Sequence, residues 1–296
     1  MSTQVTTWMV AQYQANVTVI YQQQGSLLRG TVRERSVTGE FDYWDRMGPT
    51  SPTQKTVRHA PTPLVNTPHS RRQVTLLDWE WADLIDPVDK LKTIHTFESE
   101  YAINGGLSLG REWDRQLLIA FAADAKAGKA GGTTVTFTSE AALEADYSAA
   151  AFTTPNVLTV KLALDNKIAP RGNRHIVVPP LAIEQLLKAS SAPQASSADY
   201  NTIRALVAGE INTWVGFEWH VLDLDLFEVN PSQATEPQCY AWHRDSMGVS
   251  QAMEIVTDIG IRRDLSNATQ VYLLTSFGAT RIMGQGVVRF WLDTDN

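Results

Sequence analysis

The chain has 296 residues, of which 43% are hydrophobic and 19% charged, and its formal net charge at pH 7 is −7. This composition excludes wholesale disorder, and the length suits one large domain or two closely connected ones. The single cysteine, Cys239, excludes an internal disulfide framework. Because the sequence has no signal peptide and no apolar run of about 20 residues, we expect a cytoplasmic protein outside any membrane.

The charge is unevenly distributed along the chain. Residues 1–75 contain eight Lys or Arg and four acidic residues, a net charge of +4, whereas residues 76–296 contain 17 and 28, a net charge of −11. A basic leading segment on an acidic body indicates an arm that binds nucleic acid, or one that docks on an identical neighbour. The arginines are dispersed and the whole protein is acidic, so we favour the second interpretation.

The first third of the chain is predicted to form a long hairpin. Residues 4–24 are compatible with a short helix that is too polar to stand alone. Two strand-like runs, 30–44 and 71–81, flank a stretch that contains Pro49, Pro52, Pro61, Pro63 and Pro68. Each proline removes a backbone donor and fixes one dihedral angle, so this stretch is not a helix, and it contains too few apolar residues to form a core. The legs contain few apolar residues, and such a two-stranded ribbon is marginal alone.

A long helix is predicted over residues 97–127, where apolar residues recur at steps of three and four. It would be about 40 Å long. Lys126 and Lys129 near its end match the helix dipole, and the glycines of 127–132 end it. Strands are expected at 133–138 and 156–165.

The rest of the chain alternates between the two element types. A buried strand, a Pro-Pro turn and a short helix are predicted over 174–189, and residues 190–199 form a flexible surface loop. The elements expected after it are a helix at 200–212, a strand at 216–227, a helix or sheet edge at 241–254, and strands at 270–277 and 287–292. The fold class is therefore α+β, without an internal repeat.

Three patterns with chemical potential lack the context that the chemistry needs. Residues 106–110 match G-x-S-x-G, but Ser108 lies inside a helical pattern rather than at a strand-to-helix turn. The six histidines show no spacing that places two on one face for a metal, although a site assembled from distant parts of the chain stays open. Asp223 and Asp225 share one side of a predicted strand, without the glycine turn of a calcium loop. We predict no catalytic, cofactor-binding or metal-binding residue.

The tryptophans of the hairpin legs indicate an interface. Legs with so little interior use an aromatic side chain either in a local core or as an anchor in a partner's pocket. Three tryptophans among arginines favour the partner. The predicted inter-subunit interface consists of Arg33, Arg35, Trp44, Arg46, Lys55, Arg58, Arg71, Arg72, Trp79 and Trp81.

Four runs stand in order along nearly the whole chain: QQGSLLRGTV at 23–32, TPLVNTPHSRRQVTLLDWEWADLID at 62–86, YAINGGLSLGREWD at 101–114 and TSFGATRIMGQGVV at 275–288. Together they resemble the major capsid proteins of tailed bacteriophages. The resemblance implies a Hong Kong 97-like phage capsid fold with four parts. These are an N-terminal arm (1–36), an extended β-hairpin loop (37–75), a peripheral domain with a long spine helix (76–155 and 252–296) and an axial domain (156–251).

The same resemblance implies a function and partners. The protein would be a structural component of the virion, not an enzyme, assembled in the host cytoplasm. Its hexamers and pentamers would form the icosahedral head shell around double-stranded phage DNA, with the extended loop lying across an adjacent subunit. A portal at one vertex, a cement or decoration protein and a separate scaffolding protein are the further partners that it implies. Lys55 is the one lysine of the extended loop, and we expect no covalent crosslink from it.

Three alternatives stay open at this point. The runner-up is the shell protein of a non-viral nanocompartment with the same fold, which would enclose an enzyme rather than a genome. A serine hydrolase would use Ser108 and would react with a fluorophosphonate probe. A DNA-binding module would show duplex affinity that falls steeply with salt.

Overall fold

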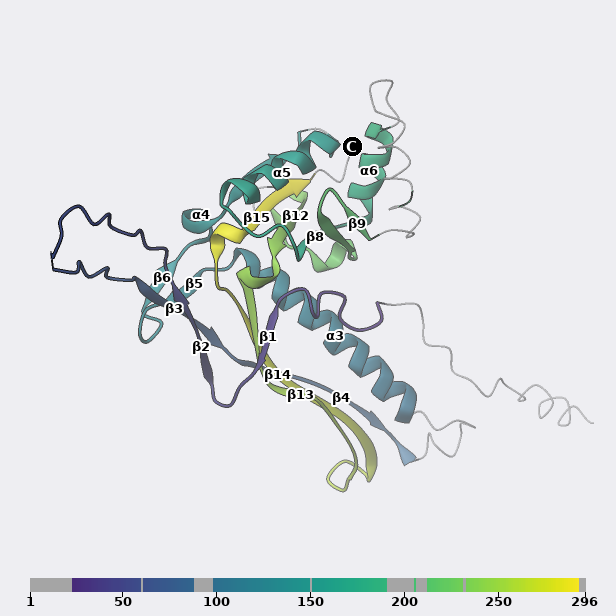
Figure 1. The fold of residues 1–296 in the computed structure, drawn as a ribbon. Coiled ribbons are helices and arrows are strands. Elements are labelled where there is room, and N and C mark those ends of the chain that lie inside the picture. The colour runs from purple at the N-terminus through teal and green to yellow at the C-terminus, as the bar shows by residue number, and fades with distance from the viewer. Residues whose placement is uncertain are drawn as a thin grey trace, which may run out of the picture. The chain divides into compact units, whose positions relative to one another are not determined.

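The computed structural model of the protein describes residues 23–59, 61–87, 98–149, 151–190, 205, 212–230 and 233–292. These residues fall into two compact units. Unit 1 contains the described residues among 1–26, 78–112 and 253–276, and unit 2 contains those among 27–77, 113–252 and 277–296. Helix α3 (Glu98–Ala122) and strands β13 (Met247–Arg262) and β14 (Ala268–Arg281), which are labelled in Figure 1, each contribute residues to both units.

Unit 1 contains the first part of α3, up to Glu112. It contains most of β4 (Leu77–Ile85), which lies at one edge of a four-stranded sheet of order β1-β13-β14-β4. Strand β1 (Arg33–Ser36), at the other edge, is parallel to β13 and belongs to unit 2. The core of the unit contains Ile85, Leu109, Val271 and Leu273, against which Trp79, Trp81, Tyr101 and Ala102 pack. A Cβ at Gly105 would lie 2.5 Å from Trp81 Cε3, so glycine permits the helix to approach this indole closely.

The larger sheet lies in unit 2. Its strand order is β7-β15-β12-β8-β10-β9, and β11 pairs with β12. The strands are β7 (Leu143–Tyr147), β8 (Arg174–Val178), β9 (Thr213–Trp214), β10 (Phe217–Val221), β11 (Val229–Asn230), β12 (Gln233–His243) and β15 (Val287–Leu292). All five residues of β8 are buried. A strand covered on both faces needs such an uninterrupted buried run.

Short helices accompany this sheet. They are α4 (Phe137–Glu140), α5 (Thr154–Asn166) and α6 (Pro180–Ser190), together with the 3₁₀ turns η1 (Leu224–Leu226), η2 (Arg244–Ser246) and η3 (Gly284–Gly286). Phe152, just before α5, stacks on Phe290 of β15 with ring centroids 5.5 Å apart. Both rings are fully buried, so the aromatic core reaches from the helix to the strand.

The predicted hairpin forms a third sheet with the order β2-β3-β5-β6. Strand β2 (Phe41–Met47) pairs antiparallel with β3 (His69–Thr75) along its whole length, from Phe41 opposite Thr75 to Met47 opposite His69. The hairpin is not an isolated ribbon, however. Strands β5 (Ala125–Ala127) and β6 (Thr133–Val135) widen it to four strands, which explains how legs with few apolar residues remain ordered.

Residues 156–165 were predicted as a strand and form helix α5 instead. Their Val and Thr residues favour a strand by propensity. The apolar residues that become buried, Val157, Val160 and Leu164, nevertheless recur at steps of three and four, as on a helix face. Thr153 enters the helix in an extended conformation, and Pro155 occupies the first turn, where it is tolerated. Packing on β15 and β7 outweighs local propensity here.

Other element boundaries also differ from the predictions. Helix α3 ends at Ala122 with no basic residue in its last turn, and Lys126 lies in β5. Asp223 precedes and Asp225 lies in the 3₁₀ turn η1, not on a strand, and 241–254 is strand apart from η2. The predicted strand–turn–helix at 174–189 and both C-terminal strands are present. The predictions for residues 4–22, 191–199 and most of 200–212 lie outside the described residues.

The pairing of β15 crosses the predicted domain boundaries. This strand belongs to the segment expected in the peripheral domain, yet it pairs with β12, which was expected in the axial domain. The two compact units likewise differ from the four predicted parts. Those parts, 1–36, 37–75, 76–155 with 252–296, and 156–251, stay a prediction about how the subunit is organised.

Candidate functional site

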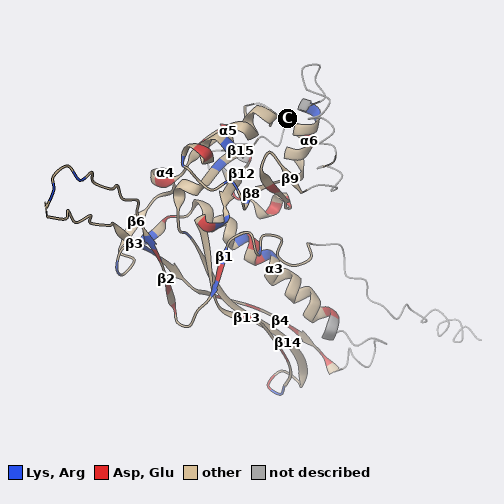
Figure 2. Ribbon diagram, in the orientation of Figure 1, with Lys and Arg blue, Asp and Glu red and all other residues tan. Residues whose placement is uncertain are grey.

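The loop between β2 and β3, residues 49–68, is largely exposed. Among its described residues, which omit 60, none lies in a helix or strand and nearly all are exposed. Apolar side chains share this exposure: Val57 is 62%, Leu64 92% and Val65 48% exposed. The loop carries Lys55 and Arg58 and no acidic residue, so in Figure 2 its only charged positions are basic.

A narrow neck closes the base of the loop. The backbone N–H of Gly48 donates to the Pro68 carbonyl at 2.8 Å, and a Cβ at Gly48 would lie 2.6 Å from Pro68 Cγ. Only glycine allows this approach. Next to it, Arg46 donates from Nε to Ser70 Oγ at 2.6 Å and from Nη1 to the Ile282 carbonyl at 2.9 Å. The neck is therefore tied both across the hairpin and to the segment after β14.

Glu140 of α4 forms ion pairs with two arginines at the base of the loop. Its Oε1 accepts from Arg46 Nη2 at 3.2 Å and from Arg72 Nη2. The Arg72 side chain is 1% exposed, and this carboxylate compensates its buried charge. Arg281, also fully buried, donates to the carbonyls of Phe121 and Ala123 at 2.8 Å. Burial lowers the pKa of Arg281, an effect that the negative charge of Glu140 opposes.

Trp44 anchors the other side of the hairpin within its own chain. Its indole is 6% exposed, packs with Val74 and Ile282, and donates from Nε1 to Ser250 Oγ at 3.0 Å. Ser250 Oγ in turn donates to Asp42, which also pairs with Arg35, and the Arg35 guanidinium lies 4.3 Å from the Trp44 ring centroid. Burial raises the pKa of Asp42, but hydrogen bonds from Arg35, Ser250 and the Tyr43 N–H bring it below its usual 3.8.

The ten predicted interface residues therefore lie in different environments. Arg33, Lys55 and Arg58 are exposed, whereas Arg35, Arg46 and Arg71 are half-buried and Trp44 and Arg72 are buried in unit 2. Arg71 pairs with Asp45 at 2.9 Å. Trp79 and Trp81 pack on the core of unit 1. Contact of these residues with another copy stays a prediction.

Ser108 does not occupy a nucleophile elbow. It lies in the middle of α3, ten residues after the helix begins, with helical residues on both sides. Gly110, of the same motif, faces the backbone of Gly25, which a Cβ there would approach to 2.7 Å. At Gly110 the motif serves close packing, as the helical pattern had indicated.

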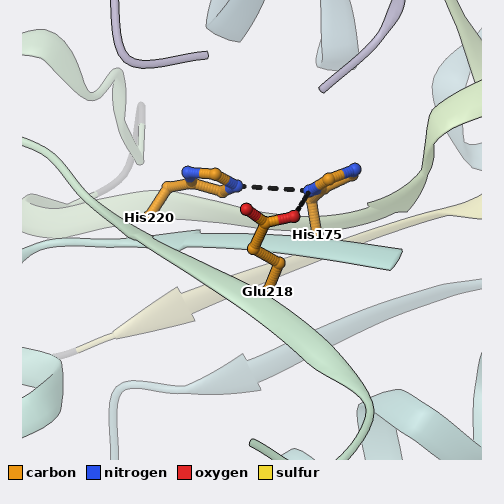
Figure 3. A group of neighbouring side chains, drawn as sticks. All are labelled: His175, Glu218 and His220. Carbon is orange, nitrogen blue, oxygen red and sulfur yellow. Dashed lines mark hydrogen bonds and ion pairs between the residues drawn. The ribbon is translucent and has the colours of Figure 1, made fainter. Parts of the chain in front are cut away.

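Histidines separated in the sequence meet on neighbouring strands. His175 of β8 lies opposite Glu218 of the parallel strand β10, and His220 follows two positions later on the same face. His175 Nδ1 lies 3.2 Å from both His220 Nε2 and Glu218 Oε2. Figure 3 shows both rings and the carboxylate pointing toward one another. Burial lowers the pKa of His175 to about 4, assisted by the charges of His220, Arg244 and His243, and burial also lowers the pKa of His220.

Sequence reasoning missed these partnerships because they join distant segments. Glu140 is 68 residues from Arg72, Ser250 is 206 from Trp44, and His220 is 45 from His175. No local motif signals any of them. For the histidines, the sequence analysis had left open only that a site could be assembled from distant parts of the chain.

Comparison with known proteins gives a consistent result. A family model described as phage capsid protein matches residues 5–292. Among solved structures, the capsid of cyanophage P-SCSP1u is similar with a TM-score of 0.69 and 12% identity, covering 95% of this chain and 92% of that one. The capsid of Ralstonia phage GP4 gives 0.69 and 10%, covering 96% and 95%. A chain of Mycobacterium phage Che8 gives 0.65 and 14%, covering 94% and 95%. No curated protein matches by sequence.

The structural matches confirm the predicted capsid fold over nearly the full length of both chains, at identities that speak for the fold alone. Among the described residues, no helix is long and apolar enough to cross a membrane.

Proposed function

Because the chain belongs to the phage capsid protein family, we propose that its copies assemble as hexamers and pentamers into an icosahedral head around double-stranded phage DNA. The family and the fold are those of a major capsid protein, a structural component of the virion that self-associates into a shell and is not an enzyme. A non-viral nanocompartment is not favoured. The finer proposal concerns the contacts by which one copy holds the next.

The loop 49–68 carries this proposal. It presents Val57, Leu64 and Val65 to water at the end of a hairpin whose base is firmly fixed. Burying such side chains against a partner gains roughly 25 cal/mol per Å² of apolar surface. The prolines restrict the loop before binding, so less conformational entropy is lost when it becomes ordered on a surface. The loop of one copy lies on the next copy.

The positive charge of the loop indicates the surface of the next copy on which it docks, which we call the acceptor. Lys55 and Arg58 are exposed and have no acidic neighbour in the loop sequence. Strand β4 in unit 1 presents the exposed acids Asp78, Glu80 and Asp83, the kind of surface on which a basic loop docks. We assign Lys55, Arg58 and Arg33 to the contact itself. Arg35, Arg46, Arg71, Arg72 and Trp44 fix the base of the loop, and Trp79 and Trp81 support the acceptor strand.

We propose the remaining partners and the division of the subunit from its membership of the phage capsid protein family. The predicted arm (1–36), extended loop (37–75), peripheral domain (76–155 and 252–296) and axial domain (156–251) describe how the subunit is divided in the shell. A separate scaffolding protein directs assembly in the host cytoplasm, a portal occupies one vertex, and a decoration protein is accommodated on the outside. The packaged DNA is contacted without sequence preference.

The test is a charge reversal in the loop. The double variant Lys55→Glu/Arg58→Glu, expressed with a scaffold, should give far fewer shells by negative-stain microscopy, because two attractions with the acceptor become repulsions. Its unassembled subunit should unfold within about 0.5 kcal/mol of the natural protein, since both side chains are exposed.

The matched control is Lys167→Glu/Arg171→Glu. It makes the same charge change at two exposed positions after α5, outside the loop. This control should assemble normally. Equal shell yields from the loop variant and the natural protein, or an equal loss in the control, would contradict the role of the loop.

A further inference from the structure

Among His175, Glu218 and His220, a single ring nitrogen lies within hydrogen-bond distance of two polar atoms. His175 Nδ1 lies within 3.2 Å of both a ring nitrogen and a carboxylate oxygen. If Nδ1 is protonated, its single N–H can donate to only one of the two neighbouring atoms. If Nδ1 is unprotonated and accepts a hydrogen bond from His220, it has no proton to donate to the carboxylate oxygen beside it. The other ring nitrogen, Nε2, is buried and has no hydrogen-bond partner among the described residues. The polar interactions of this ring therefore depend on Nδ1.

A cation satisfies all three groups at once. Two ligand atoms bound at about 2.0–2.1 Å to one tetrahedral zinc ion lie roughly 3.3 Å apart, close to both observed separations. All three candidate ligand atoms lie within 4.8 Å of one another. The Glu218 side chain is 47% exposed, so it can rotate to close the remaining gap and leaves the ion a route from solvent.

The donor set indicates which ion. Two imidazole nitrogens and one carboxylate are ligands of zinc and related divalent metals rather than of calcium or magnesium, which prefer oxygen. Both rings are buried enough to favour their neutral forms, which offer a lone pair to a metal. The carboxylate supplies compensating negative charge.

We propose that His175, Glu218 and His220 bind one Zn²⁺ ion between strands β8 and β10, with water completing the coordination. The site lies inside a single subunit and does not depend on the shell contacts proposed above. It joins two adjacent strands of the seven-stranded sheet through side chains as well as backbone hydrogen bonds. Binding stabilises the folded subunit by an amount that grows with the logarithm of one plus the ratio of the zinc concentration to the dissociation constant.

The experiment uses the unassembled full-length chain, treated with a chelator, dialysed and then titrated with Zn²⁺. We expect one zinc per chain by elemental analysis and a rise in Tm. Co²⁺ in its place should give the intense visible absorption of a four-coordinate N/O site. Glu218→Gln removes the charged ligand at an exposed position, so the fold should be retained. Zinc affinity should fall by at least the ~10–100-fold that loss of a mere outer-shell partner causes.

His69→Gln is the matched control, an exposed histidine on β3 outside the cluster. It should bind zinc as the natural protein does, and His220→Gln should bind as weakly as Glu218→Gln. Three results would each overturn the proposal. These are no zinc retained by the natural chain with unchanged Tm, equal zinc affinity in the natural chain and Glu218→Gln, or an equal loss of affinity in the His69 control.

Discussion

Replacing Glu140 with alanine removes the carboxylate on which Arg46 and Arg72 converge at the base of the loop. Arg46 keeps its hydrogen bonds to Ser70 and Ile282, but Arg72, 1% exposed, loses its ion pair, and its Nε already has no hydrogen-bond partner among the described residues. Removing one partner of a buried ion pair costs about 3–5 kcal/mol. Glu140 itself is 18% exposed, so water relieves part of the loss and we expect about 3 kcal/mol.

Urea unfolding of the unassembled subunit measures this change through the midpoint at constant slope. The matched control is Asp45→Ala, which breaks the Arg71–Asp45 pair on the same hairpin. Because Asp45 is 70% and Arg71 39% exposed, the control should lose no more than about 1 kcal/mol. Glu140→Gln should fall between the two, since it keeps an acceptor for Arg72 without the charge. Losses below about 1 kcal/mol for Glu140→Ala, indistinguishable from the control, would refute this account of the base.

Two further predictions concern Asp42 and the glycines of α3. The pKa of Asp42 is lower in the folded protein than its unfolded value, so its stabilisation is complete above about pH 4 and is lost as pH falls through the folded pKa. Asp42→Asn should reduce the unfolding free energy above that pH and flatten its pH dependence below it; an unchanged dependence in urea unfolding would contradict this. Gly105→Ala should destabilise by about 1–3 kcal/mol through overlap with Trp81. Gly106→Ala, with no atom within 4 Å, should stabilise by up to about 1 kcal/mol, and thermal unfolding that ranks the pair in reverse would be inconsistent with the packing of α3.

The hairpin shows what the sequence makes accessible. Strand-like runs at 30–44 and 71–81, on either side of five prolines, predicted the hairpin of β2 and β3 and its irregular loop, because these are local properties of the chain. The same runs also cover β1 and part of β4, which pair in another sheet, and that division was not predicted. The family resemblance then supplied the fold class, which the structural matches confirm. A strand was predicted at 133–138, where β6 lies, but its pairing with the hairpin was not predicted. The three residues of β5 were predicted as the end of the helix over 97–127, because so short a strand carries little pattern of its own.

The base of the loop shows what the sequence conceals. Trp44 was predicted to anchor in a partner, on the argument that a thin ribbon has no interior. In the structure Val74, Ile282 and Ser250 provide that interior, and the last two come from the far end of the chain. Glu140 reaches Arg72 in the same way. The composition of a hairpin strand shows how many apolar side chains it has to bury, but not which distant segment of the chain covers them.

The structure of an assembled shell tests the central claim most directly. A cryo-electron microscopy reconstruction of particles grown with a scaffold would locate residues 49–68 relative to neighbouring copies. We expect Leu64 and Val65 to be covered by an adjacent subunit, and Lys55 or Arg58 to lie within ion-pair distance of that subunit's acidic residues. A loop that folds back on its own chain, without contact to another copy, would contradict the account.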